Sequence, residues 1–166
     1  MPGLGKIGKI GKITDTERKR RRPPPEMTAG EIVATSDLLS DELKKVARLI
    51  GEGKAMKIHR MRERGEEGSV PELLVQDWLD GHNVEYEKQL WLPEANTRLD
   101  FHIRWGDIAL RVQGEYWHPK AMPNDDEIRY ALTLMGFQVV DVWEGHVYRQ
   151  LNTVMSKAIA GIETPR

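Results

Sequence analysis

The sequence contains no cysteine among its 166 residues, so it can form neither a disulfide framework nor a cysteine-ligated zinc site. It also has no run of about 18 apolar residues and no apolar core of a signal peptide. These absences predict a protein with no membrane partner that is not secreted. A chain of this length normally forms one compact domain, with room for a tail.

The chain also lacks a strong net charge, since its formal charge is -1 at pH 7. Taken alone, near-neutrality disfavours a nucleic-acid partner. The charges are segregated, however: residues 1–25 hold eight basic and two acidic side chains, a net charge of +6, which leaves -7 for the rest. This asymmetry predicts a basic arm attached to an acidic body.

The arm, residues 1–27, has glycine at every third position of a Gly-Lys-Ile repeat, then an arginine-rich cluster and a proline triplet. These features disfavour a helix and a packed core, so we expect a disordered segment. The alternatives are a solvated tail or a localisation signal. We favour contact with DNA or another nucleic acid, or with protein subunits of a larger assembly, because such basic residues neutralise phosphates. They are Lys6, Lys9, Lys12, Arg18, Lys19, Arg20, Arg21 and Arg22.

Residues 28–66 are predicted to form a helical extension, because apolar residues recur there at helical spacing. Ser40 or Asp41 is expected to cap one helix, and Gly51 and Gly53 to interrupt it. The segment 54–64 that follows is rich in lysine and arginine. It suits phosphate contact and a solvated helix face equally well.

Residues 67–166 are predicted to form an α/β domain. Ser69 and Pro71 mark the start of a helix that ends at Gly81. The later elements are expected to be strands at 84–92, 99–105 and 107–112, a helix at 124–135, a strand at 137–143 and a helix at 145–162. A hairpin followed by a strand–helix–strand unit implies a mixed β-sheet flanked by helices.

The alternation of side chains along the hairpin predicts one apolar face and one polar face. The apolar face is expected to hold Leu99, Phe101, Ile103, Ile108, Leu110 and Val112, and the opposite face Asp100, His102, Arg104, Ala109, Arg111 and Gln113. Carboxylates gathered with an imidazole suit a Mg²⁺ site with a general base. The alternative is an ordinary solvent face on which Asp100 pairs with Arg111.

Four stretches, residues 86–89, 99–101, 112–118 and 135–143, resemble the Vsr-like branch of the PD-(D/E)XK nucleases, which includes the very-short-patch-repair endonucleases. The more specific marks are the G-x-x-W-H pattern at 114–118 and the G-F-x-V-x-x-V-W pattern at 136–143. The resemblance covers about residues 69–150. It implies a restriction-endonuclease-like fold and Mg²⁺-dependent hydrolysis of a DNA phosphodiester bond.

The resemblance also implies roles for individual residues. Asp100 matches the principal metal-binding aspartate, and Glu72 matches the acidic residue on the helix before the sheet. His118 matches a catalytic histidine. Tyr116 and Trp117 match aromatic residues that contact and wedge the duplex, a use of apolar side chains known from DNA-bending proteins.

Two positions depart from the pattern. Many relatives carry glutamate where this chain has Arg111, and aspartate, histidine or lysine where it has Gln113. Arginine stays charged and cannot ligate a metal. Catalysis would then need Glu115 as a further catalytic and metal-binding carboxylate, with His118 or Lys120 for the proton chemistry.

Two hypotheses therefore stay open. The chain is either a Mg²⁺-dependent endonuclease or a nuclease-fold protein without catalysis. The second would be a structural or nucleic-acid-binding component of a phage particle or another nucleoprotein assembly. Either is expected in the cytoplasm or within such a particle. The two hypotheses differ over Arg111, which bonds Asp100 only under the second.

Overall fold

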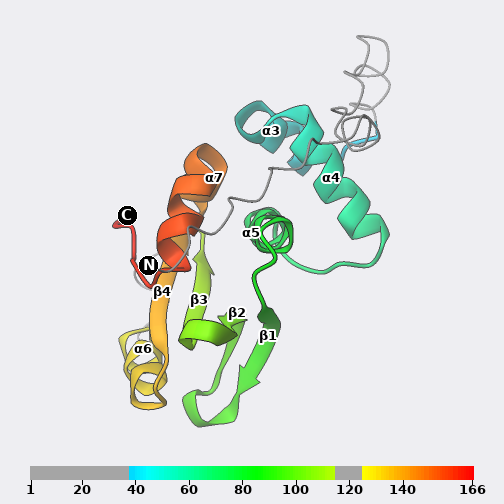
Figure 1. Cartoon of the computed structure of the whole chain (residues 1–166). Coiled ribbons are helices and arrows are strands. Elements are labelled where there is room, and N and C mark those ends of the chain that lie inside the picture. The colour runs from blue at the N-terminus through cyan, green and yellow to red at the C-terminus, as the bar shows by residue number, and fades with distance from the viewer. Residues whose placement is uncertain (1–37, 115–124) are drawn as a thin grey trace, which may run out of the picture.

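The computed structural model describes residues 38–114 and 125–166 (Figure 1). The predictions for the basic arm and for Glu115, Tyr116, Trp117, His118 and Lys120 therefore lie outside the described residues. The elements are α3 (Asp41–Ile50), α4 (Glu52–Glu63), α5 (Val70–Gly81), β1 (Tyr86–Leu92), η1 (Pro93–Ala95), β2 (Thr97–Ile103), η2 (Arg104–Gly106), β3 (Ile108–Gln113), α6 (Asp125–Leu134), β4 (Gln138–Trp143) and α7 (Glu144–Ala158).

The four strands form one mixed sheet in the order β1-β2-β3-β4. β1 and β2 pair antiparallel, as do β2 and β3, whereas β3 and β4 are parallel. The parallel pair needs a crossover, and α6 supplies it. The predicted order of elements and the mixed sheet flanked by helices are confirmed.

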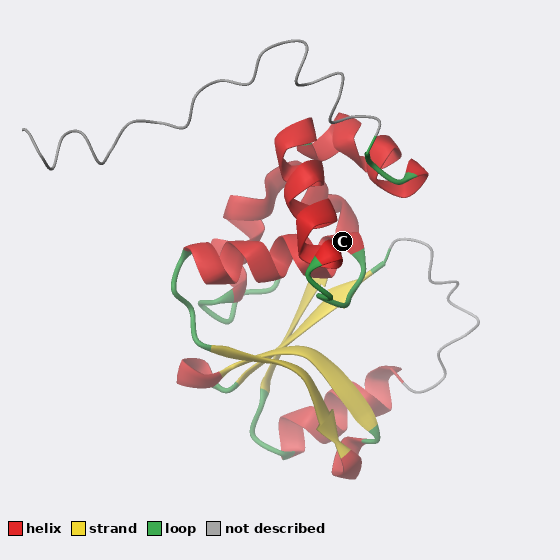
Figure 2. Cartoon of the chain, turned by 90° about the vertical axis from the view of Figure 1, so that its right-hand side faces the viewer, coloured by secondary structure: helices red, strands yellow, loops and turns green. Residues whose placement is uncertain are grey.

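The helices form layers on both faces of the sheet, with α3, α4, α5 and α7 on one side and α6 on the other (Figures 1 and 2). The larger core cluster joins α3, α4, α5 and α7 to Phe101, Ile103 and Leu110 of the sheet. A smaller cluster joins α6 to Ala109 and Val139. The face of β3 that holds Ala109 and Arg111 is thus covered by α6. The prediction that this face is an ordinary solvent surface is therefore wrong for β3.

The start of the described chain confirms two of the predicted helix signals. Ser40 caps α3, with its Oγ accepting a hydrogen bond from the Leu43 N–H at 3.3 Å. Gly51 separates α3 from α4 with a φ of 87°, a left-handed value that favours glycine. Leu43 and Ile58 are buried in the larger cluster, so α3 and α4 share a core with α5 and α7.

Several basic side chains of α4 and its C-cap are engaged in ion pairs. Lys57 pairs with Asp77 at 2.5 Å, and Arg62 pairs with Glu42 at 2.9 Å. These partners favour a solvated, internally paired helix face over a phosphate-binding one. Across the described part of the chain, no helix has the length and apolar character that crossing a membrane requires.

The hairpin departs from simple alternation at one point. Leu99, Phe101 and Ile103 are all buried, as predicted, but Leu99 lies in the smaller cluster under α6 and the other two in the larger cluster. The prediction that these three share one face is therefore wrong. The register places Gln89 of β1 opposite Asp100, and Gln89 has a left-handed φ of 56°. A left-handed residue in a strand interrupts the pleat, so the faces change at Asp100.

Candidate functional site

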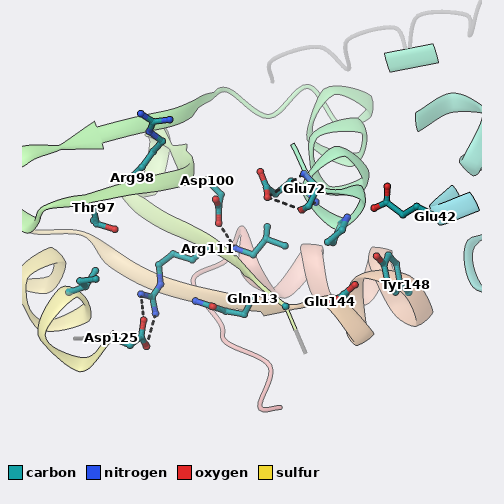
Figure 3. A pocket seen from close by; sticks show the side chains of 15 residues that line it. Glu42, Glu72, Thr97, Arg98, Asp100, Arg111, Gln113, Asp125, Glu144 and Tyr148 are labelled. Atoms are coloured by element: carbon teal, nitrogen blue, oxygen red, sulfur yellow. Dashed lines mark hydrogen bonds and ion pairs between the residues drawn. The ribbon is translucent and has the colours of Figure 1, made fainter. Parts of the chain in front are cut away.

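A cleft of about 500 Å³ lies where α5 and α7 meet β2, β3 and the start of α6 (Figure 3). Its lining includes five carboxylates and two guanidinium groups: Glu42, Glu72, Asp100, Asp125, Glu144, Arg98 and Arg111. Asp100 and Glu72 lie toward the middle of the cleft, with Glu144 and Tyr148 to one side and Asp125 to the other. The excess of acidic side chains suits a cation.

Asp100 is the most perturbed carboxylate of the cleft. Its Oδ2 accepts a hydrogen bond from the backbone N–H of Val112 at 2.7 Å. Burial is the main cause that raises the pKa of Asp100 to about 6. The nearby charge of Glu72 also raises this pKa, while the Val112 hydrogen bond and the charge of Arg111 lower it. A carboxylate that is short of solvation in this way gains from a nearby cation.

Glu72 owes its position to the first turn of α5. Ser69 Oγ accepts a hydrogen bond from the Glu72 N–H at 3.4 Å, and Glu72 Oε1 accepts one from the Ser69 N–H at 3.5 Å, which together make a capping box. Ser69 Oγ also donates to Glu72 Oε1 at 2.7 Å. The second carboxylate oxygen, Oε2, accepts a hydrogen bond from Gln89 Nε2 at 3.2 Å. Both oxygens are thus oriented by neighbours, and the carboxylate shares a cleft with Asp100.

Arg111 is directed toward Asp141 and Asp125. Its Nε and Nη2 donate to the two carboxylate oxygens of Asp141 at 2.7 and 2.8 Å, and its Nη1 donates to Asp125 Oδ1 at 2.8 Å. Burial opposes the charged form, but the hydrogen bonds and charges of these two acids outweigh it, and the pKa of Arg111 is raised. The predicted alternative, in which Arg111 pairs with Asp100 across the hairpin, is therefore wrong.

Asp141 is the centre of a network that the sequence did not reveal. Besides Arg111, it accepts hydrogen bonds from Arg129 Nη1 at 2.9 Å and from Gln113 Nε2 at 3.3 Å. Arg129 in turn bonds Glu163 at 2.6 Å. One signal was available: an aspartate within a strand of β-branched residues is expected to be buried and therefore paired.

The described residues supply two oxygen donors at the centre of the cleft. Among residues 38–114 and 125–166, no group of three or more histidine, aspartate or glutamate side chains is placed to hold a metal ion together. Mg²⁺ is commonly bound through one or two carboxylates, with water and substrate phosphate completing its shell. Asp100 and Glu72 fit that donor set. The roles predicted for Glu115, His118 and Lys120 stay predictions.

A second group of polar residues, not expected from the sequence, lies toward the α3 side of the cleft. α3 brings Glu42 there, and α7 brings Glu144 and Tyr148. Burial and a hydrogen bond to Glu144 raise the pKa of Tyr148 above its ordinary value. These residues escaped prediction because their proximity depends on the packing of α3 against α7.

Comparison with known proteins gives one structural likeness. No family model matches the chain, and no curated protein matches it. The chain is similar to the catalytic domain of the homing endonuclease I-Bth0305I, with a TM-score of 0.45 and 19% sequence identity over 57% of this chain and 94% of that one. A likeness of this strength does not assign an activity, which depends on the geometry of the cleft.

Proposed function

We propose that this chain is a metal-dependent nuclease that hydrolyses DNA phosphodiester bonds at the cleft around Asp100. One observation carries the proposal: Asp100 and Glu72 share the cleft, while Arg111 is held by Asp141 and Asp125. Arg111 lines the same cleft, but its hydrogen bonds go to Asp141 and Asp125 and not to Asp100, which supports the assignment of Asp100 and Glu72 to the metal ion. The sequence resemblance to Vsr-like nucleases supports the same assignment.

Asp100 and Glu72 would hold Mg²⁺ through their carboxylate oxygens. The bound ion would polarise the scissile phosphate and lower the pKa of a water molecule. The charge of both carboxylates offsets that of the cation, and the Val112 N–H keeps the Asp100 side chain in place. For the proton chemistry we propose His118, following the resemblance, or Lys120. Glu115 is proposed as the carboxylate that replaces the one missing at Arg111.

Binding of DNA to this acidic body needs a compensating positive charge. The body carries -7, so it would repel phosphates, and the +6 arm of residues 1–25 offsets that repulsion. We propose that the arm contacts the phosphate backbone of the DNA at a distance from the cleft. Tyr116 and Trp117 are proposed to contact the bases beside the scissile bond.

A second candidate function is nucleic-acid binding without cleavage, as a component of a nucleoprotein assembly. The observation that favours it is that Arg111, whose positive charge is permanent, lines the same cleft as Asp100 and acts electrostatically on that carboxylate. A charge that replaces a metal ligand and is satisfied within the fold is what a protein that has lost catalysis would retain.

A plasmid-nicking assay with Mg²⁺ or Mn²⁺ tests the proposal. We expect metal-dependent nicking by the wild type, unchanged nicking by Glu94→Gln, an exposed acid on η1, and a loss of at least about 100-fold in Asp100→Asn, since one metal ligand is removed. No metal-dependent cleavage above the Asp100→Asn background would reject the enzyme. DNA retention by both proteins in a gel-shift assay would then support the second function.

A further inference from the structure

The backbone of β1 is unusual at Gln89. This residue has a φ of 56°, in the left-handed region that a non-glycine residue rarely adopts, and it lies within a strand. The pairs on either side, Lys88 with Phe101 and Leu90 with Leu99, place Gln89 directly opposite Asp100. Strain of this kind tends to persist where function requires a particular side-chain position.

The left-handed turn gives two successive side chains the same direction. In a regular strand, neighbours point to opposite faces. Here Lys88 donates from Nζ to Gln76 Oε1 on α5 at 2.7 Å and to the Glu67 carbonyl, while Gln89 reaches Glu72 on the same helix. The conformation at Gln89 is what allows both side chains to reach α5 and the segment before it.

The Gln89 amide links Glu72 to the strand that pairs with Asp100. Its Nε2 donates to Glu72 Oε2 at 3.2 Å, while its backbone lies opposite Asp100 in the register of β1 and β2. An amide nitrogen is a neutral donor. It therefore fixes a carboxylate oxygen without placing a competing positive charge in the cleft.

We infer that Gln89 is a positioning residue that holds Asp100 and Glu72 in register for a shared divalent cation. The inference rests on the proposed function, because it concerns the same two carboxylates. Gln89 does not itself touch the reacting atoms. Its amide orients one oxygen of Glu72, and its backbone lies opposite Asp100 in the paired strands, so that Glu72 is fixed relative to Asp100.

The sharpest test is Gln89→Gly. Glycine suits a φ of 56° better than glutamine, so this variant removes the amide while relieving the backbone. Gln89→Asn keeps an amide that is one methylene shorter and also tolerates the left-handed region. Gln76→Ala, on α5, serves as the control, because it removes another amide that contacts β1 without touching either carboxylate.

The measurement is Mn²⁺ affinity by titration calorimetry on the full chain. We expect Gln89→Gly and Gln89→Asn to bind Mn²⁺ about 10-fold or more weakly than the wild type and Gln76→Ala to match the wild type.

The outcomes separate this inference from the proposed function. Wild-type Mn²⁺ affinity in Gln89→Gly would overturn the inference, whether or not the protein cleaves DNA. Wild-type protein that binds Mn²⁺ with the expected dependence on Gln89, yet does not nick plasmid, would support the inference and reject the nuclease. If Gln76→Ala weakens Mn²⁺ binding as much as Gln89→Gly, the effect is a general loosening of β1 against α5, and the inference fails.

Discussion

Arg111 forms a two-pronged hydrogen-bonded pair with Asp141, Nε to Oδ1 at 2.7 Å and Nη2 to Oδ2 at 2.8 Å, across the parallel strands β3 and β4. The register places the two residues directly beside each other. Planar guanidinium and carboxylate groups match in this geometry, which strengthens both contacts. The pair explains how a buried arginine in the middle of the sheet is satisfied without a hydrogen bond to Asp100.

Breaking this pair should destabilise the fold. Arg111→Ala would leave Asp141 buried with only Arg129 and Gln113 as partners, and we expect the free energy of unfolding to fall by about 3 kcal/mol. Urea denaturation followed by circular dichroism measures the change. Arg104→Ala is the matched control, since its contact to Glu87 is exposed and 3.9 Å long, and should cost less than about 0.5 kcal/mol. Equal stability of Arg111→Ala and the wild type would show that the pair contributes nothing.

Much of the fold was predictable because its signals are local. Ser69, Pro71 and Gly81 mark the ends of α5, and β-branched residues mark β4. The proximity of Asp100 and Glu72 was also predictable, since the sequence resemblance pairs them. The partners of Arg111 were not, because Asp125 and Asp141 approach it only when α6 crosses over the sheet. The change of face at Gln89 likewise escaped, since nothing in residue type announces a left-handed glutamine.

The raised pKa of Asp100 predicts an unusual dependence of stability on pH. The ordinary pKa of 3.8 applies to the unfolded chain, while the folded state holds the proton to about pH 6. Between these values the folded state binds more protons, so the free energy of unfolding of the wild type falls as pH rises from about 4 to 6 and stays lower above.

Asp100→Asn removes this titration. We therefore expect the variant to be more stable than the wild type at pH 7.5 by about 2 kcal/mol and equally stable near pH 3.5. Thermal unfolding in metal-free buffer at both pH values checks the difference. Mn²⁺ at neutral pH should then stabilise the wild type and not Asp100→Asn, because only the wild type keeps both ligands. A constant difference between the two proteins at both pH values would contradict the titration argument.

Removing the capping serine of α5 should affect both stability and metal binding. Ser69→Ala loses the bond from the Glu72 N–H and the 2.7 Å bond from Ser69 Oγ to Glu72 Oε1, while the 3.5 Å contact from the Ser69 N–H to that oxygen remains. We therefore expect a loss of about 1 kcal/mol in stability and weaker Mn²⁺ binding. Ser40→Ala removes the equivalent cap of α3 and should cost a similar free energy with unchanged Mn²⁺ affinity. Parallel denaturation and calorimetry on the two variants distinguish the effects. Equal affinities would mean that the capping box does not set the position of Glu72.

Two glycines offer opposite expectations. Gly161 has a φ of 75°, and an added Cβ would collide with the Gln138 side chain, which donates to the Gly161 carbonyl at 2.8 Å. Gly161→Ala should therefore lower the free energy of unfolding by about 1–2 kcal/mol. Gly53 lies in the first turn of α4 with open space around it, so Gly53→Ala should raise stability by about 0.5 kcal/mol. Chemical denaturation measures the free energy of unfolding of both variants relative to the wild type. A Gly161→Ala variant as stable as the wild type would mean that the Gln138 side chain moves aside without cost.

The basic arm makes a prediction about salt. If its charges lie on phosphates, each releases counterions, and the logarithm of DNA affinity falls with the logarithm of salt concentration in proportion to their number. Deleting residues 1–25 should reduce that slope by roughly 3 to 7, for about four to eight phosphate contacts. Replacing the basic residues of 18–22 by glutamine in the full-length chain keeps the arm's length and should give an intermediate slope. Fluorescence anisotropy with a labelled duplex over a range of salt concentrations measures all three proteins. If the slope is the same in all three proteins, the charges of the arm do not contact DNA phosphates. The phosphate contacts would then have to come from the acidic body.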